Sequence, residues 1–195
     1  MNTSLIQTFK QIAPISDYET ERICAAFKPI EIVKGDFFLK AGEVNKYVGF
    51  LQKGLVRYFV LKNDEESTFE ITKEGEFIAD YQSFMQRKPS IQNIQAIEDC
   101  ELLVIDFEQV IDIYKNTEHG NLLGGVIVEH RFEVMVNQLL AIYMQNQEER
   151  YLSFIDNYSD LAQRIPQFMI ASYVGIKPQS LNRMRRRFAK KSKLT

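Results

Sequence analysis

The chain has 195 residues, of which 45% are hydrophobic and 26% are charged, and its formal net charge is −2. A chain of this length can hold one or two domains with a sizeable core. No apolar run reaches the roughly 20 residues of a membrane span, and Met1 to Gln11 lacks the basic start and apolar core of a secretory signal. We therefore expect a cytoplasmic protein that does not contact membranes.

The rare reactive residues exclude several kinds of site. Cys24 and Cys100 are too few for a disulfide framework or for the four thiolates of an iron–sulfur cluster. His119 and His130 are separated by about 16 Å if they lie on one helix, so they cannot share one metal ion. No set of nucleophile, base and orienting group is recognisable. We expect no enzyme activity, no metal and no cofactor.

Residues 3–28 predict short helices that pack against the rest of the protein. Ser16 and Glu19 have the spacing of a capping box, in which a helix-capping serine and a glutamate three residues later bond each other's backbone. From Pro29 to about Phe107 the pattern changes to short runs of β-branched and aromatic residues between turns. The strands are predicted at 30–33, 37–39, 47–51, 55–60, 67–71, 91–97 and 102–105.

Seven or eight short strands at this spacing are typical of an antiparallel sandwich or barrel, most commonly a jelly roll. A long helix is predicted next, from about Glu118 to Gln147. Beyond Arg150 the chain breaks into shorter helices, one at 151–155 and one that Ser159 could cap.

The long helix carries an apolar stripe with heptad-like spacing, wider than a lone surface helix needs. We interpret it as a dimer helix. The alternative is that the stripe only packs on the barrel, because an apolar face by itself does not show whether it contacts the same chain or a second copy. The stripe consists of Val128, Phe132, Met135, Val136, Leu139, Ile142 and Tyr143.

The stretch from Pro166 to Lys191 predicts two short helices joined by a tight turn. Pro166 suits a helix start, Gly175 can take the positive φ that ends a helix, and Pro178 suits the start of the next one. Apolar residues on both sides of Gly175 have the spacing of two helices that cross steeply over a small shared core. This is the helix-turn-helix pattern. The shared positions are Ile170, Ala171, Val174, Ile176, Leu181 and Met184.

The second of these helices has a polar outer face suited to DNA. Arg and Asn can form paired hydrogen bonds with guanine and adenine edges, and additional Arg and Lys can pair with phosphates. Residues 163–195 contain nine Lys or Arg and no acid, whereas the first 162 residues contain 15 basic and 26 acidic residues. Such a basic segment indicates a polyanionic partner. The predicted DNA-binding residues are Lys177, Gln179, Ser180, Asn182, Arg183, Arg186 and Arg187.

The alternative for this segment is a solvated basic tail without a partner. Charge alone would permit it. The turn at Gly175 and the shared apolar spacing favour the DNA-binding interpretation.

The order of barrel, long helix and helix-turn-helix resembles the CRP/FNR family of bacterial transcription regulators over nearly the whole chain. Residues 34–38 with Ala41-Gly42-Glu43 resemble the opening of the cyclic-nucleotide-binding fold, residues 50–57 resemble its next strand and turn, and residues 75–78 lead into the phosphate-binding cassette. The resemblance implies an α+β protein with three parts. These are an N-terminal antiparallel β jelly roll (1–116), a long dimerisation helix (117–147) and a small all-α helix-turn-helix domain (148–195).

The cassette departs from the family pattern. In family members that bind cyclic nucleotides, a Gly-Glu pair is followed about ten residues later by an Arg that pairs with the phosphate. An ungapped alignment places Ala79, Asp80 and Ser90 at these three positions, so the main counter-charge is missing. We predict that the pocket does not bind cyclic AMP at physiological concentration, because a buried phosphate needs a paired cation. The expected effector pocket includes Ala79, Asp80, Tyr81, Ser90 and Ile91.

Two differences concern the DNA-binding end. Many family members carry a β-hairpin wing after the recognition helix and Arg-Glu at its start, whereas this sequence has Pro178-Gln179 at that start and stops a few residues beyond the helix. We expect Arg183 to read bases and Arg186, Arg187, Lys190 and Lys191 mainly to contact phosphates.

The resemblance implies a homodimeric regulator that binds double-stranded DNA and has a degenerate sensor domain for an unknown small-molecule effector. The alternative function is a small-molecule-binding module whose basic end binds a protein or binds nucleic acid nonspecifically.

Overall fold

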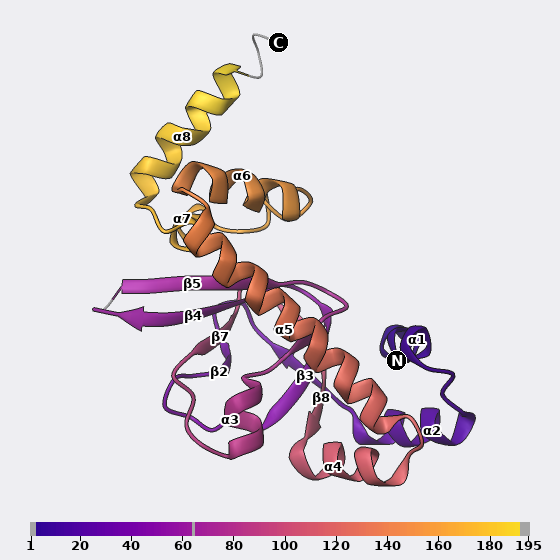
Figure 1. Ribbon diagram of the computed structural model, residues 1–195. Helices are drawn as coiled ribbons and strands as arrows, with labels where there is room; N and C mark the ends of the chain where they lie inside the picture. Colours follow the sequence, from indigo (N-terminus) through magenta and orange to yellow (C-terminus); the bar gives the residue numbers. More distant parts are fainter. Residues whose placement is uncertain (1–2, 64, 192–195) are drawn as a thin grey trace.

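The computed structural model describes residues 3–63 and 65–191, without the side chains of 189–191. Over these ranges, two helices precede a β-roll of two sheets, and five helices follow it (Figure 1). The long helix α5 (Gly120–Met144) crosses the roll. The N-terminal helices lie near one end of α5, and the C-terminal helices lie at its other end.

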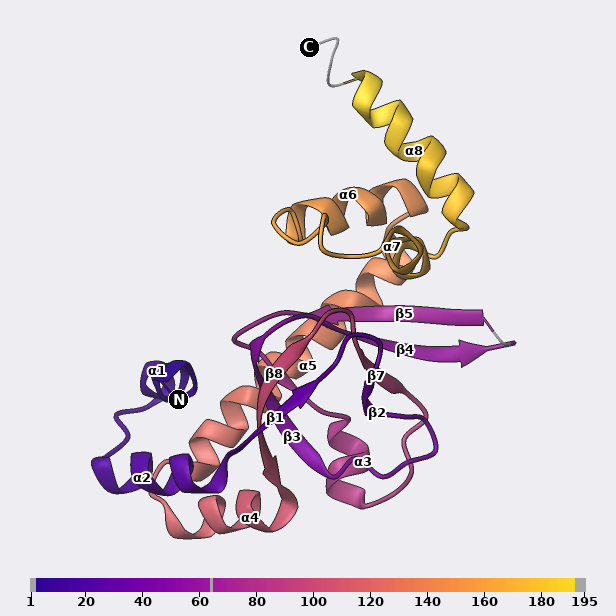
Figure 2. The same cartoon turned by 180° about the vertical axis from the view of Figure 1, so that it is seen from behind.

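The N-terminal helices are α1 (Thr3–Ile12) and α2 (Asp17–Ala26). The capping box is confirmed, because the Ser16 hydroxyl accepts a hydrogen bond from the Glu19 amide and the Glu19 carboxylate accepts one from the Ser16 amide. Leu5 and Ile23 are buried in one cluster with residues of the roll and of α5. The expected packing of these helices against the rest of the protein is therefore confirmed (Figure 2).

The two four-stranded sheets are antiparallel throughout, with strand orders β1-β8-β3-β6 and β2-β7-β4-β5. Their inner faces enclose a cluster that includes Leu51, Tyr58, Ile78 and Leu102. The predicted antiparallel roll is confirmed. The strands are β1 (Lys28–Ile32), β2 (Phe37–Leu39), β3 (Tyr47–Lys53), β4 (Val56–Lys62), β5 (Glu65–Thr72), β6 (Phe77–Ile78), β7 (Asn93–Ala96) and β8 (Cys100–Asp106).

Three elements of the sensor region were not predicted. Strand β6 has two residues, which is too short for a periodic pattern. Helix α3 (Tyr81–Gln86) begins where the Asp80 carboxylate accepts a hydrogen bond from the Ser83 amide, and it ends at Arg87 with φ of 55°. Helix α4 (Phe107–Asn116) connects β8 to α5. The strand predicted at 91–97 is shorter and spans Asn93–Ala96. Ile91 is 85% exposed and lies in the loop before it.

The predicted long helix is confirmed as α5, but it ends at Met144. The Asn146 side chain then accepts hydrogen bonds from the amides of Glu148 and Glu149 and starts α6 (Gln147–Asn157). The helix expected after Ser159 does not form, and residues 158–164 are turns. Pro166 follows closely and disfavours a helical backbone at Ile165. Leu161 and Ile165 are buried in the cluster that the C-terminal helices share with the roll.

The last two helices, α7 (Gln167–Val174) and α8 (Pro178–Lys191), confirm the predicted helix-turn-helix. They do not form an independent core. Leu55, Ile71 and Ile97 of the β-roll are buried in the same cluster as residues of α6, α7 and α8. The Ser172 hydroxyl of α7 accepts a hydrogen bond from the Thr68 amide and donates one to the Glu66 carbonyl on β5.

Candidate effector cavity and nucleic-acid interface

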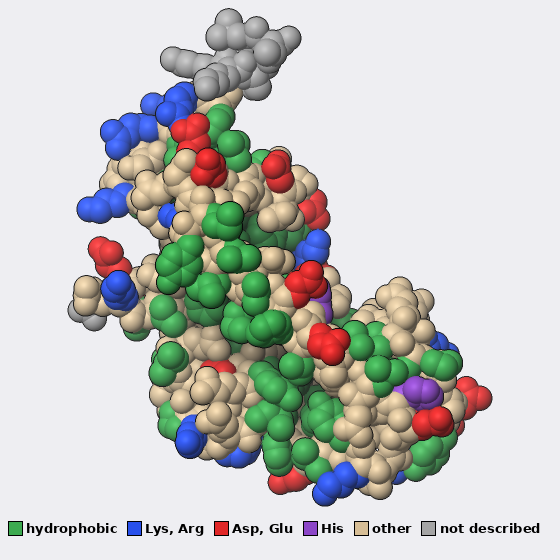
Figure 3. Space-filling model, in the orientation of Figure 1, with side chains coloured by type: hydrophobic (Ala, Val, Ile, Leu, Met, Phe, Trp, Pro, Cys, Tyr) green, Lys and Arg blue, Asp and Glu red, His purple; other side chains and the backbone are tan. Residues whose placement is uncertain are grey.

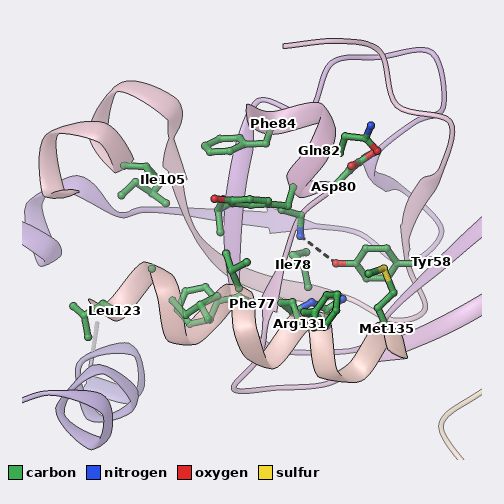
Figure 4. Close-up of a pocket in the computed structure, with 18 of the residues that line it drawn as sticks. Tyr58, Phe77, Ile78, Asp80, Gln82, Phe84, Ile105, Leu123, Arg131 and Met135 are labelled. Atoms are coloured by element: carbon green, nitrogen blue, oxygen red, sulfur yellow. Dashed lines mark hydrogen bonds between the residues drawn. The ribbon is translucent and has the colours of Figure 1, made fainter. Parts of the chain in front are cut away.

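A cavity of about 490 Å³ lies between the β-roll, the N-terminal helices, α4 and α5. Its walls are mainly apolar. Polar side chains gather at one end, where Figure 4 shows Tyr58, Asp80, Gln82 and Arg131, whereas Ile105 and Leu123 lie at the other. The apolar lining includes Phe9, Ile23, Phe27, Val48, Phe69, Phe77, Ile78, Phe84, Ile105, Val110, Ile113, Leu123, Ile127, Val128, Phe132 and Met135.

The structure brings three of the five expected pocket residues to this cavity. Ala79, Asp80 and Tyr81 line it, between β6 and the first turn of α3. Ser90 is buried but does not line the cavity, and Ile91 points into solvent. Ser90 and Ile91 lie in the loop between α3 and β7, and this loop does not border the cavity at these two residues.

The polar groups of the degenerate cassette bond to each other. The Ser90 hydroxyl donates to Asp80 Oδ2 at 2.7 Å, and the other Asp80 oxygen accepts from the Ser83 amide at 3.1 Å. The Gln92 amide donates to the Ser90 hydroxyl at 3.0 Å. Asp80 is therefore used to start α3 and to fix the following loop. Both of its oxygens already have partners within the protein.

Arg131 of α5 is the one cation among the described residues that line the cavity. Its Nη2 lies 2.5 Å from the carboxylate of Glu70, which is buried on β5 and also accepts a hydrogen bond from Thr72. Arg131 Nη1 is buried without a hydrogen-bond partner. Arg87 and Lys88 do not line the cavity, and the Arg87 guanidinium lies over the Phe107 ring instead.

Two acidic groups close to Arg131 have raised pKa values. Tyr58 accepts a hydrogen bond from the Ala79 amide at 3.1 Å, and burial raises the pKa of its phenol. Burial also raises the pKa of Glu76 above its usual range, an effect that the Arg131 charge opposes and the Glu70 charge reinforces. Arg131 is thus already paired with the Glu70 carboxylate, which does not favour an added anion.

Arg131, Glu70 and Tyr58 were not predicted as pocket residues. A partial signal was present for Arg131, because it lies three residues after Val128 and four before Met135 and so shares their face of the helix. The pairing with Glu70 carried no local signal, since the two residues are 61 positions apart.

The predicted DNA-binding side chains lie on the outer face of α8 and at the turn before it. Lys177, Gln179, Asn182 and Arg186 are exposed, and Arg183 is exposed with its guanidinium 3.2 Å from the Ser180 hydroxyl. Figure 3 shows the Lys and Arg side chains grouped over this helix. The side chains of Lys190 and Lys191 lie outside the described residues.

Arg187 differs from the other arginines of α8, because it forms an ion pair with Glu148 of α6. The opposite face of α8 is buried. Leu181 is fully buried against α7, and Met184 and Phe188 pack partly against the same cluster. The helix therefore has the two faces that a recognition helix needs, one docked on the protein and one free.

The apolar face of α5 remains exposed in the single chain. Phe132 is 61% exposed and Tyr143 is 81% exposed, whereas Val128 and Val136 are half-buried. In Figure 3 hydrophobic side chains extend along this helix. Contiguous apolar patches of this kind mark interaction surfaces. The exposed large residues of α5 are Leu122, Phe132, Met135, Leu139, Leu140, Ile142, Tyr143 and Met144.

Other kinds of site receive no support from the described residues. In the ranges that the structure covers, no three His, Cys, Asp or Glu side chains come together as a metal site would need. Within the same ranges, no helix has the length and apolarity to span a bilayer.

The cyclic nucleotide-binding domain family matches residues 29–117, which run from β1 to the end of α4. No curated protein sequence matches the chain. The c-di-GMP responsive global regulator CLP of Xanthomonas campestris has a similar structure, with 14% identity, a TM-score of 0.73, and coverage of 91% of this chain and 93% of its own.

Two further solved structures agree with this fold. FixK2 of Bradyrhizobium japonicum is 13% identical with a TM-score of 0.75, over 85% of this chain and 86% of its own. A protein described as a CRP/FNR-family transcriptional regulator, from Eubacterium rectale, is 18% identical with a TM-score of 0.71, over 91% and 85%. At such identities the likeness shows a common fold.

Proposed function

We propose that the chain is a homodimeric, sequence-specific DNA-binding regulator of transcription, and the proposal starts from two findings: residues 29–117 match the cyclic nucleotide-binding domain family, and the described chain has the fold of the CRP/FNR regulators. The observation that carries this proposal is the exposed basic face of α8 on a buried helix-turn-helix scaffold. The exposed apolar face of α5 supports pairing of two copies. The proposal divides the chain into a sensor domain (1–116), a dimerisation helix (117–147) and a helix-turn-helix domain (148–195), and it assigns DNA binding to the last of these.

In this mechanism the α5 helices of two copies pack together and set the separation of two α8 helices. The two helices must match half-sites that are about one turn of DNA apart, roughly 34–36 Å. A change in the cavity reaches α5 directly, because Val128, Arg131 and Met135 belong both to that helix and to the cavity wall. The effector acts by shifting α5 between two arrangements.

Selection of bound sequences from random DNA duplexes tests the proposal. A recurring palindrome with two half-sites is the expected result, since two identical recognition helices are related by a two-fold axis. Salt-sensitive binding without any recurring motif would instead support the alternative function, a small-molecule-binding module whose basic end binds nucleic acid nonspecifically.

A further inference from the structure

The size and lining of the cavity restrict what it can hold. A volume of about 490 Å³ falls within the roughly 300–1,000 Å³ of typical small-molecule sites. Aromatic and branched aliphatic side chains from six parts of the fold, α1, α2, the β-roll, α3, α4 and α5, form most of the wall. Such walls favour a largely apolar ligand, because they form no hydrogen bonds with polar groups and because burial of apolar surface is favourable.

The polar end leaves one group to be satisfied. Both oxygens of Asp80 are bonded, and the Glu70 carboxylate is bonded to Arg131 and Thr72. Arg131 Nη1 is buried without a partner, and a buried donor without an acceptor costs free energy. A ligand that places an acceptor there satisfies the group.

The charge of that acceptor follows from its surroundings. The positive charge of Arg131 is already balanced by Glu70 at 2.5 Å, and Asp80 is a second carboxylate on the same wall. A bound anion would add a negative charge beside these two in a mainly apolar site, which is unfavourable. A cation would be repelled by Arg131, and both oxygens of Asp80 already accept hydrogen bonds.

We propose that the cavity binds a neutral, largely apolar small molecule whose hydrogen-bond acceptor, such as a carbonyl, accepts from Arg131. This inference rests on the proposed function only in treating the bound molecule as the effector. Binding itself is independent of DNA. Cyclic nucleotides and fatty acid anions are excluded by the same argument.

The test uses N-phenyl-1-naphthylamine, a neutral apolar fluorophore, and measures its displacement from the full-length protein. We expect fluorescence enhancement on binding, displacement by 2-decanone, and weaker displacement by decanoate, which has the same chain length but carries a charge. Cyclic AMP should displace nothing. Displacement by decanoate or cyclic AMP more readily than by 2-decanone overturns the proposal.

Variants locate the site. Val128→Phe fills the cavity and should abolish the fluorescence enhancement, whereas Val134→Phe makes the same change on a half-buried residue of α5 outside the lining. If both variants lose the fluorescence enhancement equally, or if both keep it, the assignment of the binding site to this cavity is wrong.

The double variant Glu70→Gln with Arg131→Met removes both partners together and leaves no buried charge unpaired. It should still bind the fluorophore but should lose roughly tenfold in affinity for 2-decanone, because one hydrogen bond to a charged donor is gone. Unchanged 2-decanone affinity shows that Arg131 does not hold the acceptor.

A second copy of α5 is the competing occupant. If only a variant unable to pair, Leu139→Arg, binds the fluorophore, the partner helix fills the cavity and the ligand proposal fails. The ligand proposal can fail while the DNA-binding proposal holds. In that case the fluorophore experiments give a negative result, but selection from random duplexes still recovers a palindrome.

Discussion

Glu19 is almost completely buried, yet its environment favours the charged carboxylate. Burial by itself raises its pKa. Hydrogen bonds with Ser16 and with the backbone and ring of His119 lower the pKa by more than burial raises it, so that the pKa is about 2. The ordinary value is 4.5. A lowered pKa in the folded state means that this carboxylate stabilises the fold fully above pH 4.5 and that the contribution is lost as the pH falls towards 2. Glu19 thereby connects α2 to the start of α5.

We predict that Glu19→Gln lowers the urea midpoint of unfolding at pH 7, and that the difference from the native protein shrinks between pH 4.5 and 2. The carboxylate accepts from the Ser16 amide with one oxygen and from the His119 amide with the other, whereas a glutamine amide has one neutral acceptor oxygen and leaves one of these donors without a partner. Asp17→Asn removes an exposed carboxylate from the same helix and should leave the midpoint nearly unchanged. A Glu19→Gln difference that stays constant down to pH 2 would contradict the assignment.

Arg183 and Arg186 are both exposed on α8, but we assign them different tasks. Arg183→Ala should reduce discrimination between the selected operator and operators with one substituted base pair, by about 1–3 kcal/mol at the affected position. Arg186→Ala should weaken binding to all sequences alike and lower the salt slope by about 1. Binding measured by fluorescence anisotropy at several salt concentrations separates the two. Uniform weakening by Arg183→Ala would remove its base-reading role.

The turn between α7 and α8 shows how one residue fixes the geometry of two elements. Gly175 has φ of 78°, and its amide and that of Ile176 donate to the carbonyls of Ser172 and Ala171. This is the Schellman arrangement that ends a helix. From α6, the Arg150 guanidinium donates to the Val174 carbonyl. The start of α8 is therefore fixed by contacts on both sides of the turn.

We predict that Gly175→Ala destabilises the protein by about 1–2 kcal/mol, because an L-residue is strained at positive φ. An added Cβ would also lie 3.1 Å from Arg150 Nη2. Gly125→Ala is the matched control, since nothing lies within 4 Å of a Cβ at that position on α5. The midpoint of thermal unfolding and the operator affinity should both fall for Gly175→Ala. For Gly125→Ala the operator affinity should hold and the midpoint should hold or rise, because alanine suits a helix interior better than glycine. Equal behaviour of the two variants would count against the turn as the cause.

At the scale of the whole molecule, α5 is the element that reaches every part. It borders the cavity, and its exposed apolar face is the proposed dimer contact. We predict that Leu139→Arg converts the dimer to a monomer in sedimentation equilibrium and lowers operator affinity by at least tenfold, roughly the cost of burying one unpaired charge. Leu61→Arg, an equally exposed position on β4, should leave both unchanged. A native protein that sediments as a monomer would refute the dimer proposal.

The C-terminal helices and the β-roll share a buried cluster, so we expect them to unfold together. Tyr158 donates to the Ile71 carbonyl, and Arg164 pairs with Glu74 and Glu98 across the same contact. Differential scanning calorimetry should show one transition for the native chain, with calorimetric and van't Hoff enthalpies in agreement. Two separated transitions would mean that the shared cluster does not couple the parts.

The amino-acid sequence by itself determined the features that depend on near neighbours. The capping box at Ser16, the strands of the roll other than β6, and the helix-turn-helix around Gly175 follow from short spacings, turn residues and periodicity, and each is confirmed. The prediction of a helix after Ser159 was wrong, because Pro166 disfavours a helical backbone at Ile165 and leaves too few residues for a helix.

Only the tertiary structure decided the chemistry of the cavity. Arg131 meets Glu70 across 61 positions, and the N-terminal helices supply part of the wall. Ser90 turns inward to Asp80, while Ile91 beside it faces solvent. The physical reason is that local sequence specifies backbone geometry, whereas the pairing of distant side chains depends on how sheets and helices pack, which local patterns do not encode.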